Sequence, residues 1–166
     1  LDSGSTDQGQ PLVESAGGQW FVNTNWQGFG KQRQLAQSYA TGDWILALDA
    51  DEEVTPQLKQ SILEVIAHPP ANTVYGIKRI DCIFGHEIDN SYWALKAHWR
   101  LYPKAFQYND NLVHESVELN GAVTQTLKGT MLHHTADTPQ FGLDKRLQYA
   151  KAWAVDRHQR GKNVSI

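Results

Sequence analysis

Cysteine is nearly absent from this chain, with Cys82 as its single thiol among 166 residues. One thiol can form neither an internal disulfide nor a cysteine-rich metal site, so both stabilising devices are excluded. No apolar run approaches the roughly 20 residues that a membrane-spanning helix requires. Internal repeats, linkers and low-complexity tracts are also lacking. These absences predict one folded domain that depends on its own hydrophobic core.

An excess of positive charge is absent as well, because 15 Lys and Arg residues stand against 18 Asp and Glu residues, for a formal net charge of −3. Nucleic-acid-binding domains usually carry a basic surface, so we expect no nucleic-acid partner. Hydrophobic residues make up 40 % and charged residues 20 % of the chain, which are ordinary proportions for a globular protein. We therefore expect a soluble domain, of a length that buries roughly 70 % of its unfolded surface.

The sequence also lacks an initiator methionine and a signal peptide, since Leu1 leads directly into a turn-forming segment. A natural chain would hardly begin one residue before a turn. We therefore expect residues 1–166 to be a fragment of a single domain whose first strand and C-terminal end are missing. In such a fragment the lack of a signal peptide says little about the compartment.

Strand and helix patterns alternate in the first part of the chain. Helices are predicted over residues 12–16 and 31–39, and a third begins at Pro56 and ends before residues 68–70. Residues 43–48 are almost uninterruptedly apolar, which is typical of a strand covered on both faces. This alternation predicts an α/β fold with a mainly parallel sheet and helices on both faces.

The pattern changes after Val74, where strands of mixed polarity predict a smaller antiparallel extension over residues 75–84, 94–102, 116–119 and 122–132. A C-terminal helix is predicted from Pro139 onward. We expect its apolar side chains to face the core, namely Phe141, Leu143, Leu147, Ala150, Trp153 and Ala154. Its basic residues are expected largely on the outer face: Lys145, Arg146, Lys151, Arg157 and Arg160. That face is either solvated or rests on anionic lipid.

An acidic cluster at residues 49–53 follows the predicted apolar strand. Ligands in α/β sheets bind at the carboxyl ends of strands, where loops present polar groups. Carboxylates packed this densely repel one another unless a cation neutralises them, and oxygen-rich sites suit Mg²⁺ or Mn²⁺. A divalent ion that bridges Asp51 to a diphosphate would neutralise the charge on a leaving nucleotide. The alternative is a solvated loop before the helix that Thr55 caps.

Residues 2–7, Asp-Ser-Gly-Ser-Thr-Asp, form a turn of small residues that would let backbone N–H groups or the Asp2 carboxylate approach a ligand. The alternative is an ordinary strand-to-helix turn in which Asp7 caps the helix. Aromatic residues crowd the stretch before Glu115, and they would build either a sugar-binding groove or core bulk: Tyr92, Trp93, Trp99, Tyr102 and Tyr108.

Six segments occur in the order and spacing seen in family 2 glycosyltransferases: residues 2–7, 28–34, 48–52, 99–102, 113–115 and 133–135. The chain resembles this family over nearly its whole length, most strongly the bacterial lipopolysaccharide-core β-1,4-glucosyltransferase group. The resemblance implies a single catalytic domain of the GT-A fold, an inverting mechanism, a UDP-sugar donor and a divalent metal, Mn²⁺ or Mg²⁺.

The resemblance also assigns roles to individual residues. It implies that Asp49 and Asp51 form a DxD motif whose second aspartate binds the metal, with Asp49 near the metal and the ribose. His133 completes the metal shell, with His134 as the alternative. Glu115 matches the catalytic carboxylate that removes the acceptor proton.

Further residues complete the predicted site. Glu115 acts either alone or with the help of its neighbour His114, since the His-Glu pair here departs from the Glu-Asp pair of the family. The resemblance implies that the nucleotide-sugar is bound by Asp2, with Ser3 beside it, and by Arg33. Arg33 would otherwise be a helix-surface charge. The planar fork of Arg100 would bind a phosphate or pair with a nearby acid.

The expected function is transfer of a hexose, glucose by preference, from a UDP-sugar to a lipopolysaccharide-core or related glycolipid acceptor. This expectation implies a cytoplasmic protein with peripheral contact at the inner membrane, acting in the assembly of the cell envelope. Two alternatives are a metal-dependent nucleotidyltransferase and a nucleotide-sugar-binding fragment without turnover.

Overall fold

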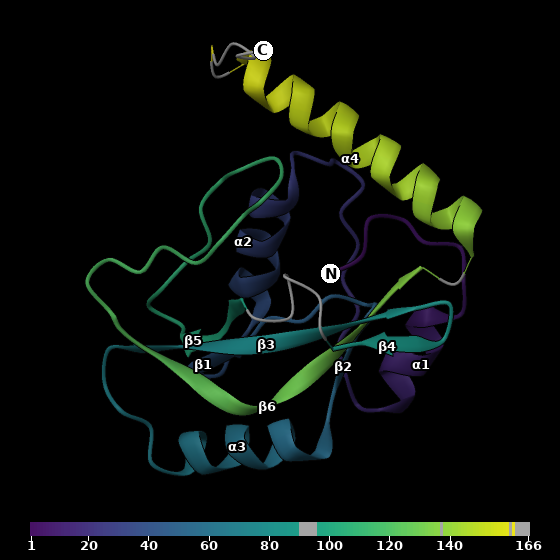
Figure 1. Cartoon of the computed structure of the whole chain (residues 1–166). Helices are drawn as coiled ribbons and strands as arrows, with labels where there is room; N and C mark the ends of the chain where they lie inside the picture. The colour runs from purple at the N-terminus through teal and green to yellow at the C-terminus, as the bar shows by residue number, and fades with distance from the viewer. Residues whose placement is uncertain (90–95, 137, 160, 162–166) are drawn as a thin grey trace.

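The computed structural model describes residues 1–89, 96–136, 138–159 and 161. Its helices surround one curved sheet (Figure 1). The helices are α1 (Gly9–Ser15), α2 (Phe29–Tyr39), α3 (Pro56–Ala67) and α4 (Pro139–Gln159). The strands are β1 (Trp44–Leu46), β2 (Glu52–Val54), β3 (Thr73–Ile83), β4 (His86–Ile88), β5 (Ala97–Pro103) and β6 (Val123–Ala136).

The sheet has the strand order β1-β5-β3-β6-β2, and β4 pairs with β3 as a hairpin. Among these named strands only β3 and β6 run parallel, and the other pairs are antiparallel. The α/β class and the C-terminal helix are confirmed, whereas the sheet is mixed rather than mainly parallel. The alternating first part of the chain contributes only the short strands β1 and β2 and a parallel bridge between Asp2 and Val22, so it does not set the direction of the sheet.

Two hydrophobic clusters lie on opposite faces of the sheet, because neighbouring residues of a strand point to opposite sides. Tyr75 and Leu101 belong to the cluster under α3, which contributes Leu58 and Ile62. The adjacent residues Val74 and Tyr102 belong to the second cluster, with Phe106, Tyr108 and Val117. Figure 1 shows α3 against one face of the sheet and α2 against the other. Helices on both faces were predicted, and the structure has them.

The start of α3 follows its predicted chemistry. The Thr55 hydroxyl accepts a hydrogen bond from the backbone N–H of Leu58 and donates one to the Thr130 carbonyl of β6. Pro56 occupies the first helical position, where its missing N–H costs nothing. The cap therefore ties the helix to the sheet as well as starting it.

Several predictions are corrected by packing. Leu46 and Leu48 remain 37 % and 36 % exposed, so the strand at residues 43–48 is half-buried rather than covered on both faces. Tyr102 and Tyr108 are core residues and do not line a groove. The predicted strand at 116–119 is reduced to a single bridge. Tyr92 and Trp93 lie outside the described residues.

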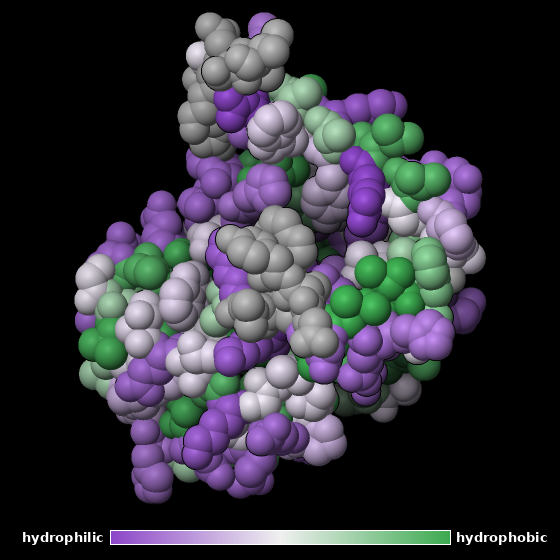
Figure 2. Space-filling model, in the orientation of Figure 1, coloured by the Kyte–Doolittle hydropathy of each residue, from purple (hydrophilic) through white to green (hydrophobic). Residues whose placement is uncertain are grey.

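The orientation of α4 also differs from the prediction. Leu143 and Leu147 are 58 % and 59 % exposed, whereas Lys145 between them turns toward the body of the protein. Apolar residues are visible along α4 on the face drawn in Figure 2. The predicted outer residue Arg160 lies outside the described ranges. Within those ranges no helix combines the length and apolar character needed to cross a membrane.

Candidate active site

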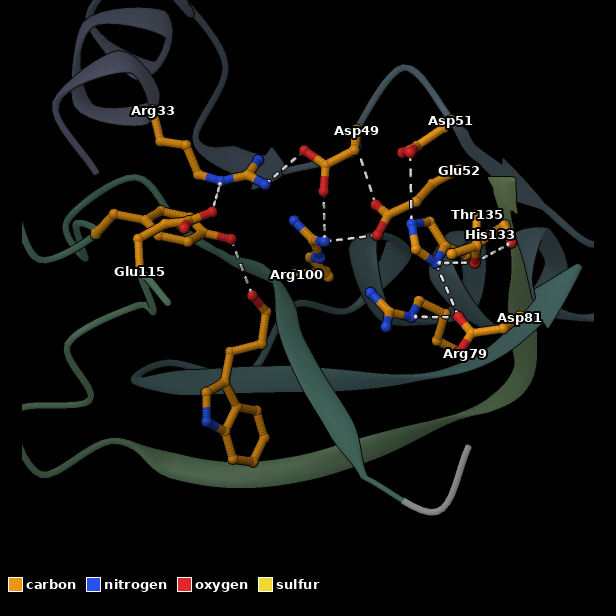
Figure 3. A network of polar contacts seen from close by, with 12 residues as sticks. Arg33, Asp49, Asp51, Glu52, Arg79, Asp81, Arg100, Glu115, His133 and Thr135 are labelled. Atoms are coloured by element: carbon orange, nitrogen blue, oxygen red, sulfur yellow. Dashed lines mark hydrogen bonds and ion pairs between the residues drawn. The ribbon is translucent and has the colours of Figure 1, made fainter. Parts of the chain in front are cut away.

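Acidic and basic side chains from several parts of the fold meet in one network above the sheet, and Figure 3 shows most of them. Arg33 comes from α2, Asp49 and Asp51 from the turn after β1, Arg100 from β5 and His133 from β6. Glu115 comes from the loop between β5 and β6, and Lys145 from α4. The structure thus brings together most of the residues assigned from the sequence.

Gly30 explains how α2 reaches the loop that carries Glu115. The N–H groups of Phe29 and Gly30 donate to the carbonyls of Leu112 and Asn111, at 3.1 and 3.0 Å. A Cβ atom at Gly30 would overlap the carbonyl oxygen of Asn109. Only glycine permits so close an approach of two backbone segments, so this motif places the 109–115 loop against α2.

Arg33 joins the two sides of the site. Its Nε atom donates to Glu115 Oε1 at 2.8 Å, and its Nη2 atom donates to Asp49 Oδ1 at 2.6 Å. The guanidinium also lies over the Tyr108 ring, 5.0 Å from its centroid. The predicted alternative of a surface charge is therefore contradicted, since the Arg33 side chain is only 15 % exposed.

Arg100 forms a second bridge. Its Nη2 atom contacts Asp49 Oδ2 at 2.8 Å and Glu52 Oε1 at 2.6 Å. The Glu52 side chain is fully buried, and its other oxygen accepts the backbone N–H of Asp49 at 2.9 Å. Burial opposes ionisation of Asp49, but Arg100 and Arg33 outweigh it and lower the pKa of this carboxyl. Asp49 is therefore a charged group held between two arginines.

His133 and Asp51 form the other half of the network. Antiparallel pairing of β2 with β6 sets Glu52 opposite His133 and brings Asp51 Oδ2 to 3.4 Å from His133 Nε2. The opposite ring nitrogen lies 2.8 Å from Asp81 Oδ1, which also contacts Arg79. Burial opposes the charge on His133, but its contacts with Asp51 and Asp81 raise its pKa.

The neighbouring histidine points elsewhere. His134 Nε2 contacts Glu53 Oε2 at 3.3 Å on the surface, where both side chains are about half exposed or more. Of the two histidines, the geometry therefore favours His133 as the one that faces Asp51.

The structure does not assemble the predicted metal ligands into a preformed centre. Both Asp49 oxygens are engaged by arginines, and Lys145 Nζ lies 2.8 Å from the same Asp51 oxygen that faces His133. Among the described residues, no three His, Cys, Asp or Glu side chains are arranged to hold an ion. Asp51 and His133 are the two predicted ligands that face one another, and a divalent ion held by so few protein groups would take its other ligands from a bound molecule and water. Dependence on Mn²⁺ or Mg²⁺ stays a prediction.

The first turn is held by local contacts. The Asp2 carboxylate accepts from the N–H groups of Gly4 and Ser5 at 2.6 and 2.7 Å, and its contacts with Ser5 lead those that lower its pKa. The Ser3 hydroxyl accepts from Gln32 Nε2 at 3.1 Å. Ser3 is thereby linked to the helix residue that precedes Arg33, whereas Asp2 stabilises its own turn.

His114 is exposed and has a positive φ of 59°. A left-handed residue other than glycine costs of order 1–3 kcal/mol and persists only where its surroundings hold it. Val113 before it is buried, and Glu115 after it turns inward to Arg33. The turn at His114 therefore directs Glu115 into the network while the imidazole stays at the surface.

A pocket of about 240 Å³ opens beside Arg33 and Asp49. Trp26 and Phe29 line it as an edge-to-face pair with ring centroids 4.7 Å apart. A larger cavity of about 370 Å³ lies between α3 and β6, but none of the predicted site residues line it. The smaller pocket is the functional candidate, because it shares two residues with the network.

Four site residues were not assigned from the sequence: Lys145, Asp81, Glu52 and Tyr149. Tyr149 stacks on Phe29 with ring centroids 5.8 Å apart. One signal was present, since residues 142, 145, 149 and 152 share one helical face and are spaced by three or four positions. The prediction missed that face because it placed Leu143 and Leu147 toward the core, and they lie on another side of the helix.

Comparison with known proteins identifies the family of this chain. The model of Glycosyl transferase family 2 matches residues 1–119. An uncharacterized glycosyltransferase of Rickettsia prowazekii is 28 % identical over 99 % of this chain and 60 % of its own length.

A second relative is the lipopolysaccharide core biosynthesis glycosyltransferase LpsC of Rhizobium meliloti. It is 26 % identical over 98 % of this chain and 62 % of its own length. The chain thus spans about three fifths of the relatives that it matches. Since the family model covers most of the chain, the chain belongs to glycosyl transferase family 2.

Proposed function

We propose that residues 1–166 form a single GT-A catalytic domain that transfers a hexose, with glucose as the first choice, from a UDP-sugar to a lipopolysaccharide-core or related glycolipid acceptor. The observation that carries the proposal is the Arg33 bridge, which joins Glu115 to Asp49 through one guanidinium. A transfer reaction needs a base for the acceptor and a polar site for the donor close together. The bridge supplies that proximity.

The reaction is a single displacement with inversion. The acceptor hydroxyl oxygen forms a bond to the anomeric carbon while the bond from that carbon to the diphosphate oxygen breaks, and the electron pair leaves with the diphosphate. The acceptor proton passes to Glu115. Arg33 holds Glu115 Oε1, so Oε2 is the atom that takes the proton. His114, next to Glu115, would assist from the surface.

The donor is proposed to lie along the pocket beside Arg33. Flat aromatic side chains with a few polar groups suit a nucleobase and ribose, and Trp26 and Phe29 provide the former while Asp49 provides the latter. Arg100 holds Asp49 in place. Asp2 and Ser3, at the turn linked to α2 through Gln32, are proposed to approach the nucleoside.

The acceptor class is taken from LpsC, whose name assigns it to lipopolysaccharide core biosynthesis. A glycolipid acceptor would place the protein at the cytoplasmic face of the inner membrane, as a peripheral protein. Exposed apolar residues on α4 are compatible with such contact.

Substitution of Glu115 tests the proposal. Glu115→Gln keeps an oxygen that accepts from Arg33 but loses the base, so UDP-glucose binding should persist while transfer to a lipopolysaccharide-core acceptor falls about 10²- to 10⁴-fold. Glu118→Gln, three residues away on the exposed surface, is the matched control. Binding is measured by calorimetry and transfer by UDP release. Unchanged transfer in Glu115→Gln would exclude Glu115 as the base.

Two further results would change the proposal. Donor binding without transfer by the unsubstituted chain would support the nucleotide-sugar-binding alternative. Transfer that survives EDTA would exclude the predicted need for Mn²⁺ or Mg²⁺.

A further inference from the structure

Helix α4 crosses the network through successive turns of one face. Near its start, Gly142 packs close to Ala136 at the end of β6. One turn later Lys145 contacts Asp51, and one turn after that Tyr149 stacks on Phe29 of α2. The helix thus spans from the end of the sheet, over Asp51, to the pocket beside Arg33.

Charge determines which side of α4 faces the site. Lys145 is 26 % exposed and faces a carboxylate, whereas Leu143 and Leu147 on either side are more than half exposed. A helix attached only for stability would bury its leucines, since each buried leucine contributes about 1.5–3 kcal/mol. This helix instead presents a lysine to the acidic cluster.

The contacts of Lys145 differ from those of the two arginines. Arg33 and Arg100 each hold two carboxylates, so if either turned away it would leave a carboxylate of low exposure unpaired, Glu115 at 14 % or Glu52 at 0 %. Lys145 holds one oxygen of Asp51, and its ammonium has three N–H donors. Its four-carbon stem is flexible, and lysine is a common phosphate ligand.

We infer that Lys145 contacts the diphosphate of the donor directly and offsets negative charge on the leaving nucleotide. This inference rests on the proposed function. As the donor enters, the Lys145 ammonium is shared between Asp51 and the diphosphate while α4 stays in place. It remains protonated throughout: the electron pair of the broken bond stays on the diphosphate, and the acceptor proton goes to Glu115. The positive charge at Asp51 is thus supplied by the chain itself.

The test compares a nucleoside diphosphate with the monophosphate. Calorimetry of the full chain with UDP and with UMP, in EDTA and again with Mn²⁺, is carried out on Lys145→Met and Lys145→Arg. Lys145→Met should weaken UDP binding about tenfold or more, because a charge-assisted hydrogen bond is lost, and should leave UMP binding within about twofold. Lys145→Arg should recover most of the UDP affinity. Lys151→Met, an exposed lysine of the same helix, should change neither.

Several results would overturn the inference. Unchanged or tighter UDP binding in Lys145→Met would mean that the lysine serves only Asp51. Equal losses for UDP and UMP would indicate a structural role. A loss that Mn²⁺ abolishes would assign the charge to a metal ion instead.

Failure of the proposed function is distinguishable from these outcomes. If GDP or dTDP binds and UDP does not, the proposed donor is wrong. The affinities of the Lys145 variants for that diphosphate and for its monophosphate then decide the role of Lys145. If the selective loss appears but no transfer occurs, the inference stands and the proposed activity falls. If no nucleoside diphosphate binds to the unsubstituted chain, both are wrong.

Discussion

The arginine half and the lysine half of the network neutralise the same kind of group in different ways. In the arginine half, Arg33 and Arg100 connect three carboxylates, one of which, Glu52, is fully buried. In the lysine half, Lys145 from α4 contacts the partly exposed Asp51. Planar guanidinium groups fix geometry, whereas an ammonium on a flexible stem can exchange partners. The arginine half is a rigid frame that holds Glu115 and Asp49, and the lysine half offers an adjustable cation.

Removal of Arg100 should give the largest effect. Arg100→Met leaves Glu52 buried without its cation, so the free energy of unfolding should fall by about 3–5 kcal/mol. Lys145→Met, the matched change in the lysine half, should lower it by about 1 kcal/mol or less, because that pair is partly exposed. Urea denaturation of both variants measures the difference. Equal losses would break the distinction between a rigid and an adjustable half.

Substitution of Gly30 should have a smaller effect on the same half. A Cβ atom at Gly30 would overlap the Asn109 carbonyl, so Gly30→Ala should destabilise the fold by about 1–3 kcal/mol and separate Glu115 from Arg33. Gly42→Ala is the control, since its Cβ would have ordinary contacts. Thermal unfolding and transfer rate are the measurements. A Gly30→Ala variant with normal transfer would show that the close approach is not needed to position Glu115.

Low pH should lower the free energy of unfolding through His98, which lies two residues before Arg100 on β5. Burial, with the charges of Arg79, Arg100 and Lys96, lowers the pKa of His98 to about 4, from an unfolded value of 6.5. The folded state therefore resists protonation: its stability is complete above pH 6.5 and declines as the pH falls toward 4. Because His98 as a whole is only partly buried, the loss should reach about 2 kcal/mol at most.

Urea titrations between pH 7 and pH 4 measure this decline. His98→Phe should flatten it, while His68→Phe, on the surface at the end of α3, should leave it unchanged. A decline of equal slope in His98→Phe would assign the acid sensitivity to other groups.

Local chemistry was the part of the fold that could be predicted. Thr55 and Pro56 mark the start of α3 because capping and the missing proline N–H act within a single turn. The sheet direction was not predictable in the same way, since it depends on which long strands pair. β3 and β6 carry the parallel pairing, and the chain between them contains β4 and β5.

The acidic cluster shows the same division within the site. Its density indicated that Asp49 and Asp51 need positive charge nearby, and a metal was the expected source. In the structure Asp49 and Asp51 receive that charge from residues 16, 51 and 94 positions away along the chain. Such distant partners leave no local pattern, so charge density predicted the need for cations but not their identity.

The sequence by itself determined the capped start of α3, because the Thr55 cap and the proline act within one turn, and it placed an acidic turn after β1. The tertiary structure alone decided the orientation of α4. Apolar residues occur on all sides of this helix, so hydrophobicity selects no face. The acidic cluster under α4 selects the face of Lys145, because an ammonium near carboxylates is stabilised where a leucine would not be.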